Sequence, residues 1–209
     1  MLYTALIYGG EKRRYYRHQS PEDGSVDYFD ADGRSARKFL MRKPIAQAVM
    51  RSGFGMRRHP VLGYSKMHTG VDWAAPRGTP IYASGNGIIK IAERHGGYGN
   101  YVKIQHANGY ETGYGHMTSF ARGLKAGQRV RQGQVIGYVG STGLSTGPHL
   151  HYEVEVNGRH MNPMSIKVPR GRELEGRALA EFQRDRARID GLIEKPSGQA
   201  LAQPVSSGG

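Results

Sequence analysis

The sequence predicts a mainly β protein that ends in one helix. Glycine supplies 31 of 209 residues, about 15%, against a usual share of about 7%. The 13 tyrosines and the many short apolar runs are typical of strands joined by tight turns. Several runs are joined by Gly or Asn-Gly pairs, which predicts a curled antiparallel sheet. The glycines follow no triplet period and form no Gly/Ser tract, so collagen and a flexible linker are excluded.

The first zone of the chain, residues 1–44, mixes charged and aromatic residues. The segment Asp30-Ala31-Asp32-Gly33 predicts a hairpin turn between short strands. This zone is too short to form a hydrophobic core of its own.

The second zone, residues 45–167, holds most of the glycine and nearly all the alternating apolar runs. We expect this zone to be the globular domain. The expected strands lie at residues 81–83, 87–93, 101–106, 110–116, 135–139 and 149–156. Turns are expected at Gly96-Gly97, Asn108-Gly109 and Asn157-Gly158.

The third zone, residues 168–209, predicts a charged helix over residues 173–194, followed by a disordered tail. One apolar stripe is expected from residues at helical spacing, namely Leu179, Phe182, Ile189 and Ile193. Pro196 ends the helix. The dense charges favour a solvated helix lying on the globular domain over a nucleic-acid-binding arm.

The net charge indicates an anionic partner. Thirty Lys and Arg against 17 Asp and Glu give +13, with a pI near 10.1. Nucleic acid, an acidic membrane and an acidic cell-wall polymer all fit this charge. The absence of cysteine excludes disulfides, thiolate metal ligands and a cysteine nucleophile. No apolar stretch approaches the roughly 20 residues of a membrane helix.

The first residues contain a brief apolar run, residues 2–8, without the basic start and cleavage pattern of a signal peptide. If the protein is exported, we expect this chain to be a fragment or a processed form.

Two groups among the nine histidines have spacings that suit metal binding. In His68-Thr69-Gly70-Val71-Asp72, the residues are poor helix formers, and a straight strand would hold His68 and Asp72 about 13 Å apart. A bend at Gly70 would bring them together as a metal half-site. This spacing alone is weak evidence.

The second group is His149-Leu150-His151, at the start of an expected strand. Residues i and i+2 of a strand point to the same face about 6–7 Å apart, so both imidazoles address one site while Leu150 enters the core. One histidine can bind metal and the other can act beside it. Two histidines and one carboxylate make a three-ligand zinc site with a position left open for water. Without cysteine, zinc bound through nitrogen and oxygen is the best-fitting metal.

A further candidate is His116, in the segment Gly113-Tyr114-Gly115-His116-Met117. From spacing alone, a lone histidine is more often structural. The remaining histidines have no partner at a useful spacing and are expected at the surface or in packing, namely His18, His59, His95, His106 and His160.

Four ordered segments together resemble a known family. They lie at residues 52–60, 68–80, 114–117 and 147–153. Their order and spacing resemble those of the LytM and lysostaphin-type zinc metalloendopeptidases, which cut peptidoglycan peptides, and in particular the Gram-negative type. The resemblance covers roughly residues 50–165 and implies a barrel-like antiparallel β-sandwich of the duplicated hybrid motif type.

The resemblance also implies roles for five residues. His68, Asp72 and His151 would hold one zinc ion per active site. His149 would be the general base, and His116 would stabilise the oxyanion. Residues 1–44 would be the end of a preceding β-containing domain or segment, which could fill the groove or pack beside it.

The expected function is therefore hydrolysis of peptide cross-links in peptidoglycan, with the D-alanyl–diaminopimelate bond favoured. The expected location is the periplasm or cell envelope, with a membrane anchor in a longer precursor. The alternative is a non-catalytic relative that binds the cell wall as a scaffold or as an activator of other hydrolases. Because all five positions are filled, we favour the enzyme. Nucleic acid is not an expected partner, because the arginines are dispersed and no nucleic-acid-binding motif is present.

Overall fold

The computed structural model describes residues 1–21, 24, 26–58, 64–169 and 171–194. The chain forms two compact units. The "strand–helix unit" joins the described residues among 1–38 to residues 171–194, and the "β unit" is formed by the described residues among 39–169. Each unit has its own hydrophobic core, so each is described by itself.

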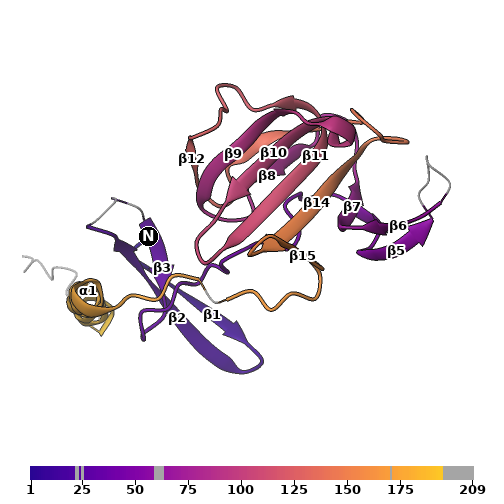
Figure 1. Ribbon diagram of the computed structural model, residues 1–209. Helices are drawn as coiled ribbons and strands as arrows, with labels where there is room; N and C mark the ends of the chain where they lie inside the picture. Colours follow the sequence, from indigo (N-terminus) through magenta and orange to yellow (C-terminus); the bar gives the residue numbers. More distant parts are fainter. Residues whose placement is uncertain (22–23, 25, 59–63, 170, 195–209) are drawn as a thin grey trace, which may run out of the picture. The chain divides into compact units, whose positions relative to one another are not determined.

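The β unit is built almost entirely of antiparallel strands (Figure 1). Its large sheet has the order β12-β9-β10-β11-β14-β7-β4; β13 pairs with β11 and β8, and β15 pairs with β14. The strands of this sheet are β4 (Val49–Ser52), β7 (Gly70–Ala74), β8 (Pro80–Tyr82), β9 (Gly87–Arg94), β10 (Asn100–Gln105), β11 (Tyr110–Phe120), β12 (Arg129–Val130), β13 (Val135–Val139), β14 (His149–Val156) and β15 (Arg159–Met161). A separate hairpin is formed by β5 (Gly55–Arg58) and β6 (Ser65–His68). The short 3₁₀ helix η1 (Gly96–Tyr98) joins β9 to β10.

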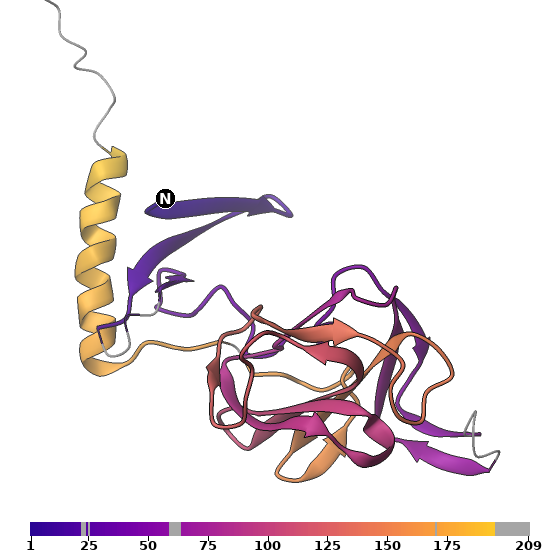
Figure 2. The ribbon, with the colours of Figure 1, turned by 90° about the horizontal axis from the view of Figure 1, so that it is seen from above.

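This architecture confirms the predicted fold class, a mainly antiparallel β protein with one C-terminal helix. Seen from above, the strands of the β unit curl around a common interior (Figure 2). Each of the six expected runs lies within one residue of a strand or forms part of a longer one. Asn108 and Gly109 have φ values of +57° and +71° between β10 and β11, as a tight hairpin turn requires.

Side chains of β14 alternate between the hydrophobic core and the opposite face of the strand, where the site histidines lie. Leu150 and Tyr152 are fully buried and pack with Val71 and Trp73 of β7 in the core of the β unit. His149 and His151 therefore point to the opposite face of the strand.

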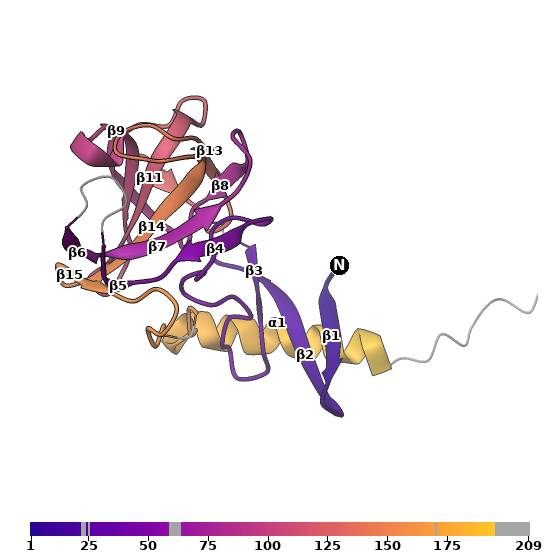
Figure 3. The same ribbon diagram turned by 90° about the vertical axis from the view of Figure 1, so that its right-hand side faces the viewer.

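The strand–helix unit contains a three-stranded sheet of β1 (Tyr3–Tyr8), β2 (Glu11–Gln19) and β3 (Val26–Phe29), with the helix α1 (Gly176–Glu194). Figure 3 shows α1 running alongside these strands. The Phe182 ring lies 5.7 Å from Phe29 and 6.4 Å from Tyr16 between ring centroids. Ile189 and Leu174 complete the buried cluster, and Leu179 and Ile193 pack against it.

The predicted apolar stripe of the helix is confirmed, but its expected partner is not. We expected the helix to lie on the globular domain, and its buried residues belong instead to the core of the strand–helix unit. The first zone lacks a core of its own because three of the five buried residues of this cluster come from the C-terminal segment, namely Leu174, Phe182 and Ile189. The expected disordered tail lies outside the described residues.

The turn expected at residues 30–33 is present, with the Gly33 amide donating to the Asp30 carbonyl at 3.0 Å. It is followed by a single bridge between Phe29 and Ser35 and not by a second strand. Within the described part of the chain, no helix has the length and apolarity needed to span a membrane.

Candidate metal centre

The candidate metal ligands lie where β6, β7 and β14 meet. His68 is the last residue of β6, Asp72 lies in the middle of β7, and only Thr69 separates the two strands. His151 is directly opposite Asp72 in the β14–β7 register. The break between the two strands therefore falls at Thr69, directly before Gly70.

Gly70 allows β7 and β14 to pack closely. A Cβ at this position would collide with the backbone carbonyl of Tyr152 and would lie 2.9 Å from Glu153 Cγ. A side chain at residue 70 would therefore push β7 away from β14 and separate Asp72 from His151.

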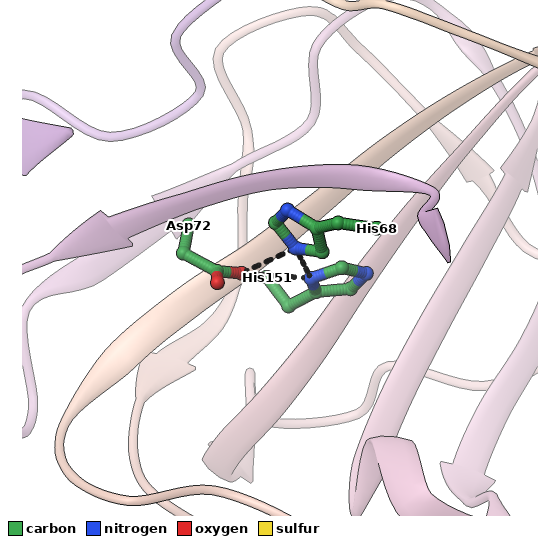
Figure 4. A group of neighbouring side chains, drawn as sticks. All are labelled: His68, Asp72 and His151. Atoms are coloured by element: carbon green, nitrogen blue, oxygen red, sulfur yellow. Dashed lines mark hydrogen bonds and ion pairs between the residues drawn. The ribbon is translucent and has the colours of Figure 1, made fainter. Parts of the chain in front are cut away.

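Three donor atoms converge at this point (Figure 4). His151 Nδ1 lies 2.8 Å from Asp72 Oδ1, and His68 Nε2 lies 3.1 Å from the same oxygen. The two imidazole nitrogens are 3.2 Å apart. All three residues are buried, each less than a tenth exposed.

Hydrogen bonds behind the ligands determine which ring nitrogens are free. His68 Nδ1 donates to the Gly53 carbonyl at 2.6 Å, and His151 Nε2 donates to Glu153 Oε1 at 3.0 Å. Because a carbonyl and a carboxylate only accept, these two nitrogens carry the hydrogens. The lone pairs of His68 Nε2 and His151 Nδ1 therefore face each other and the Asp72 carboxylate, an arrangement that requires a cation between them.

Zinc fits this donor set. Zinc binds imidazole nitrogen and carboxylate oxygen at about 2.0–2.2 Å, which places tetrahedral ligand atoms roughly 3.3 Å apart. The donor separations of 2.8–3.2 Å are close to that value. Within the described residues, only one other group of His and acidic side chains could hold a metal, namely Glu153, Glu155 and His160, and there Lys103 Nζ already lies 2.9 Å from Glu155 Oε1.

The electrostatics of the centre also favour a bound positive charge. Burial alone lowers the pKa of His151, but its hydrogen bonds to Asp72 and Glu153 outweigh burial and raise that pKa to about 9. Burial raises the pKa of Asp72, but hydrogen bonds from His151 and His68 hold it well below its usual range. The carboxylates thus stabilise a cation here, which is a proton in the absence of metal and a metal ion when one is bound.

Arg57 of β5 holds the other oxygen of the aspartate. Its Nη2 donates to Asp72 Oδ2 at 2.9 Å. This contact leaves Oδ1 of Asp72 as the oxygen that faces the two imidazoles.

Two further histidines lie beside the centre. His149 Nδ1 donates to the Gly147 carbonyl at 2.8 Å, so its Nε2 is bare, and that atom lies 3.8 Å from Asp72 Oδ1. His116 Nδ1 donates to the Thr142 carbonyl at 2.8 Å, and its ring centroid lies 4.7 Å from that of His149. The structure therefore brings all five predicted site residues together.

His116 adopts an unusual backbone conformation. Its φ is +62° at an irregularity of β11, and such a conformation in a non-glycine residue costs of order 1–3 kcal/mol. Asn108 and Asn157, the other such residues among those described, belong to turns, whereas His116 lies within a strand.

Burial is the main cause that lowers the pKa of His116, to about 4. The ring is therefore neutral near pH 7, with its hydrogen on Nδ1 and a lone pair on Nε2. His116 donates a hydrogen bond through Nε2 only when the ring takes up a second proton.

Glu153 is the main site residue to which sequence reasoning assigned no role. It is 1% exposed, and its Oε1 accepts hydrogen bonds from His151, Thr69 and Tyr98. Burial raises the pKa of Tyr98, which keeps its hydroxyl a donor. Glu153 follows His151 by two residues on the same strand face, so the alternation that identified the histidine pair could have identified this carboxylate as well.

The other histidines mostly follow the expectation of packing or surface roles. His18 and His106 are buried, and His95 is exposed. His160 is closer to the site than expected, with its Nδ1 3.9 Å from Glu153 Oε2. His59 lies outside the described residues.

The five residues open onto a groove of about 720 Å³. It is lined by residues of β4, β5 and β6 and by residues 97–98 and 144–148. The three ligands are part of this lining, so a molecule in the groove reaches them.

Comparisons with known proteins agree with this geometry. The model of peptidase family M23 matches residues 66–163. The DD-carboxypeptidase/endopeptidase Mpg of Neisseria meningitidis is 47% identical over 156 residues, which cover 75% of this chain and 35% of that protein. This chain therefore spans about a third of the length of that relative.

Two solved structures are similar as well. A zinc-containing peptidase from Vibrio cholerae matches with a TM-score of 0.59 and 34% identity, over 80% of this chain and 50% of that one. A mutant catalytic domain of the prophage-encoded M23 protein EnpA from Enterococcus faecalis matches with a TM-score of 0.51 and 40% identity, over 59% of this chain and 95% of that one.

Proposed function

The chain belongs to peptidase family M23, and on that premise we propose that it is a zinc-dependent endopeptidase that hydrolyses peptide cross-links of peptidoglycan. One observation carries this proposal: two bare imidazole nitrogens and one carboxylate oxygen meet within 3.2 Å of one another on the floor of a groove. The metallopeptidase domain is residues 45–167, which contain the whole family match.

The metal would be held by His68 through Nε2, by Asp72 through Oδ1 and by His151 through Nδ1. Zinc bound there supplies Lewis acidity, which polarises a carbonyl and lowers the pKa of water from about 15.7 to about 7. Arg57 and Glu153 keep two of these ligands oriented, since each binds the ligand atom that faces away from the metal.

His149 is the general base of the proposed reaction. Its Nε2 takes a proton from the attacking water and passes it to the amine that leaves. The Gly147 carbonyl keeps the hydrogen of the neutral ring on Nδ1, so Nε2 is available. General acid–base catalysis of this kind contributes roughly 10²–10⁴ in rate.

His116 stabilises the oxyanion in this proposal. The Thr142 carbonyl occupies Nδ1, so only Nε2 can serve the oxyanion, and it donates a hydrogen bond there after the ring has taken up a second proton from solvent.

The substrate bond that we propose is the D-alanyl–diaminopimelate cross-link, and the site of action is the periplasm or cell envelope. The name of the Neisseria relative, a DD-carboxypeptidase/endopeptidase, supports cleavage after a D-residue. The net charge of +13 supports attraction to a carboxylate-rich wall polymer.

Digestion of purified sacculi tests this function. The zinc-loaded chain is incubated with sacculi that contain diaminopimelate, and the released fragments are identified by mass spectrometry. We expect cross-linked dimers to become monomers ending in D-alanine, and we expect a chelator to stop the reaction and added zinc to restore it. A zinc-loaded chain that leaves the dimers intact would overturn the proposal.

A further inference from the structure

The lining of the groove at the metal centre is uneven in charge. Its residues from β4, β5 and β6 include three with cationic side chains, Arg51, Arg57 and Lys66. The lining residues 97–98 and 144–148 carry no charged side chain. Among the described residues, Asp72 supplies the only carboxylate of the lining.

The strand register places these cations beside the metal ligands. The β4–β7 pairing passes from Met50 opposite Trp73 to Ser52 opposite Asp72, so Arg51 is the extra residue of a bulge next to Asp72. Bulges of this kind re-aim a side chain. In the β5–β6 hairpin, Lys66 is opposite Arg57 and lies two residues before His68, so it shares a strand face with that ligand.

Only one of the three cations is matched by an acid. Arg57 donates to Asp72 at 2.9 Å. Across the described residues, Arg51 and Lys66 form no ion pair, and both are exposed. Like charges directly opposite each other, as Arg57 and Lys66 are, destabilise a strand pair. The hairpin therefore keeps Lys66 opposite a second cation at a cost in stability, which a bound anion would offset.

We propose that Arg51 and Lys66 form a subsite for a free carboxylate on the substrate residue that supplies the nitrogen of the scissile bond. This inference rests on the proposed function. In a diaminopimelate cross-link, the carbon bonded to that nitrogen bears a free carboxylate, and a terminal residue after the scissile bond bears one too. An internal glycine bridge has no carboxylate there, so the subsite would select against it.

The position of the subsite agrees with the path of the leaving group. In the sheet, β7 lies between β14, which carries His149, and β4, which carries Arg51. The amine that receives its proton from His149 then lies over β7, and a carboxylate on the same carbon reaches Arg51 on the next strand.

A pair of matched peptides tests the subsite. Both contain D-alanine before the scissile bond; the following residue carries a free carboxylate in one peptide and a carboxamide in the other. The hydrolysis of both peptides by the zinc-loaded chain is measured for the wild type, for the double variant Arg51→Ala/Lys66→Ala and for Lys66→Glu. Lys90→Glu is the matched control, because Lys90 is an exposed lysine of β9 outside the groove and the change in charge is the same.

We expect the wild type to prefer the carboxylate peptide about tenfold in kcat/KM, mainly through KM, because one charge-assisted contact is worth about that much. The double variant and Lys66→Glu should lose this preference, and Lys90→Glu should keep it. Equal rates for the two peptides with the wild type, or an equal loss on both peptides in the double variant, would overturn the subsite.

Two further experiments complete the test. The first asks whether the bound carboxylate belongs to a cross-link or to a chain end, and the second distinguishes failure of the subsite from failure of the proposed function. A cross-linked dimer is compared with a peptide ending in D-alanyl-D-alanine, and the subsite predicts the same tenfold loss on each substrate that is cleaved. Binding of both matched peptides is also measured by calorimetry. If neither peptide is cleaved, the proposed function fails. The subsite is still supported if the wild type binds the carboxylate peptide more tightly than the carboxamide peptide and the double variant does not. Equal binding of the two peptides by the wild type would overturn the subsite.

Discussion

His151 and His18 are both nearly fully buried and both contact a carboxylate, yet only His151 lies in a candidate metal centre. His18, in the strand–helix unit, has one contact, from Nδ1 to Asp185 Oδ2 at 3.2 Å, and its ring packs edge-on against Phe29 and Phe182. His151 has a carboxylate on each side, and a second imidazole faces its Nδ1. A buried histidine is suited to bind metal when one ring nitrogen donates a hydrogen bond to an acceptor and the other ring nitrogen faces additional ligand atoms.

The largest expected difference between the two regions is in metal content. His151→Ala should abolish zinc binding, because it removes one of three donors, whereas His149→Ala should keep one zinc and lose about 10²–10⁴ in rate. His18→Phe should change neither zinc content nor the chemical step. Metal analysis and hydrolysis of sacculi check these outcomes. Zinc lost from His149→Ala and retained by His151→Ala would reverse the assignment of base and ligand.

The next effect is confined to the strand–helix unit. Phe182→Ala removes a fully buried ring from that core and should destabilise the unit by about 3–5 kcal/mol. Hydrogen exchange of α1 amides measures this loss, and zinc content should not change. Leu192→Ala, at a position 54% exposed on the same helix, should cost little. Equal protection of α1 in Phe182→Ala and the wild type would contradict the described core.

A smaller effect concerns the carboxylate behind His151. Glu153→Ala should weaken zinc binding about 10–100-fold, because it removes the acceptor that orients the ring. Glu153→Gln keeps an acceptor oxygen and should recover part of this loss. Asp185→Ala, the same change beside His18, should leave zinc affinity unchanged. Competition with a chelator measures all three, and equal affinities in Glu153→Ala and the wild type would show that Glu153 does not orient the ligand.

The smallest effect is a pH dependence of stability from His106. Burial lowers the pKa of His106 below its usual value of 6.5 and outweighs the hydrogen bond from Nδ1 to the Asn86 carbonyl, which raises it. Because the unfolded chain takes up the proton more readily, this stability is present above about pH 6.5 and is lost as the pH falls below it. The loss is at most about 1.4 kcal/mol per pH unit. Urea unfolding from pH 8 to pH 5 should show a flatter dependence for His106→Gln than for the wild type, and parallel curves would contradict the shift.

Local patterns were sufficient to predict the strands and the histidine pair. Alternation along residues 149–156 predicted that Leu150 enters the core while His149 and His151 share a face, and the structure agrees. The stripe of α1 was equally visible in the sequence, because helical spacing is a local property. The partner of that stripe was not visible, because β2 and β3 lie more than 140 residues earlier in the chain.

The sequence by itself determined the residue types of the centre and the strand faces on which they lie, since both depend on near neighbours. Only the tertiary structure decided which nitrogen is bare in His68, His116 and His151, because their hydrogen-bond acceptors are brought to the rings by the fold. It also decided that Arg51 flanks Asp72 through a bulge, which follows from the register of two strands and not from spacing in either of them.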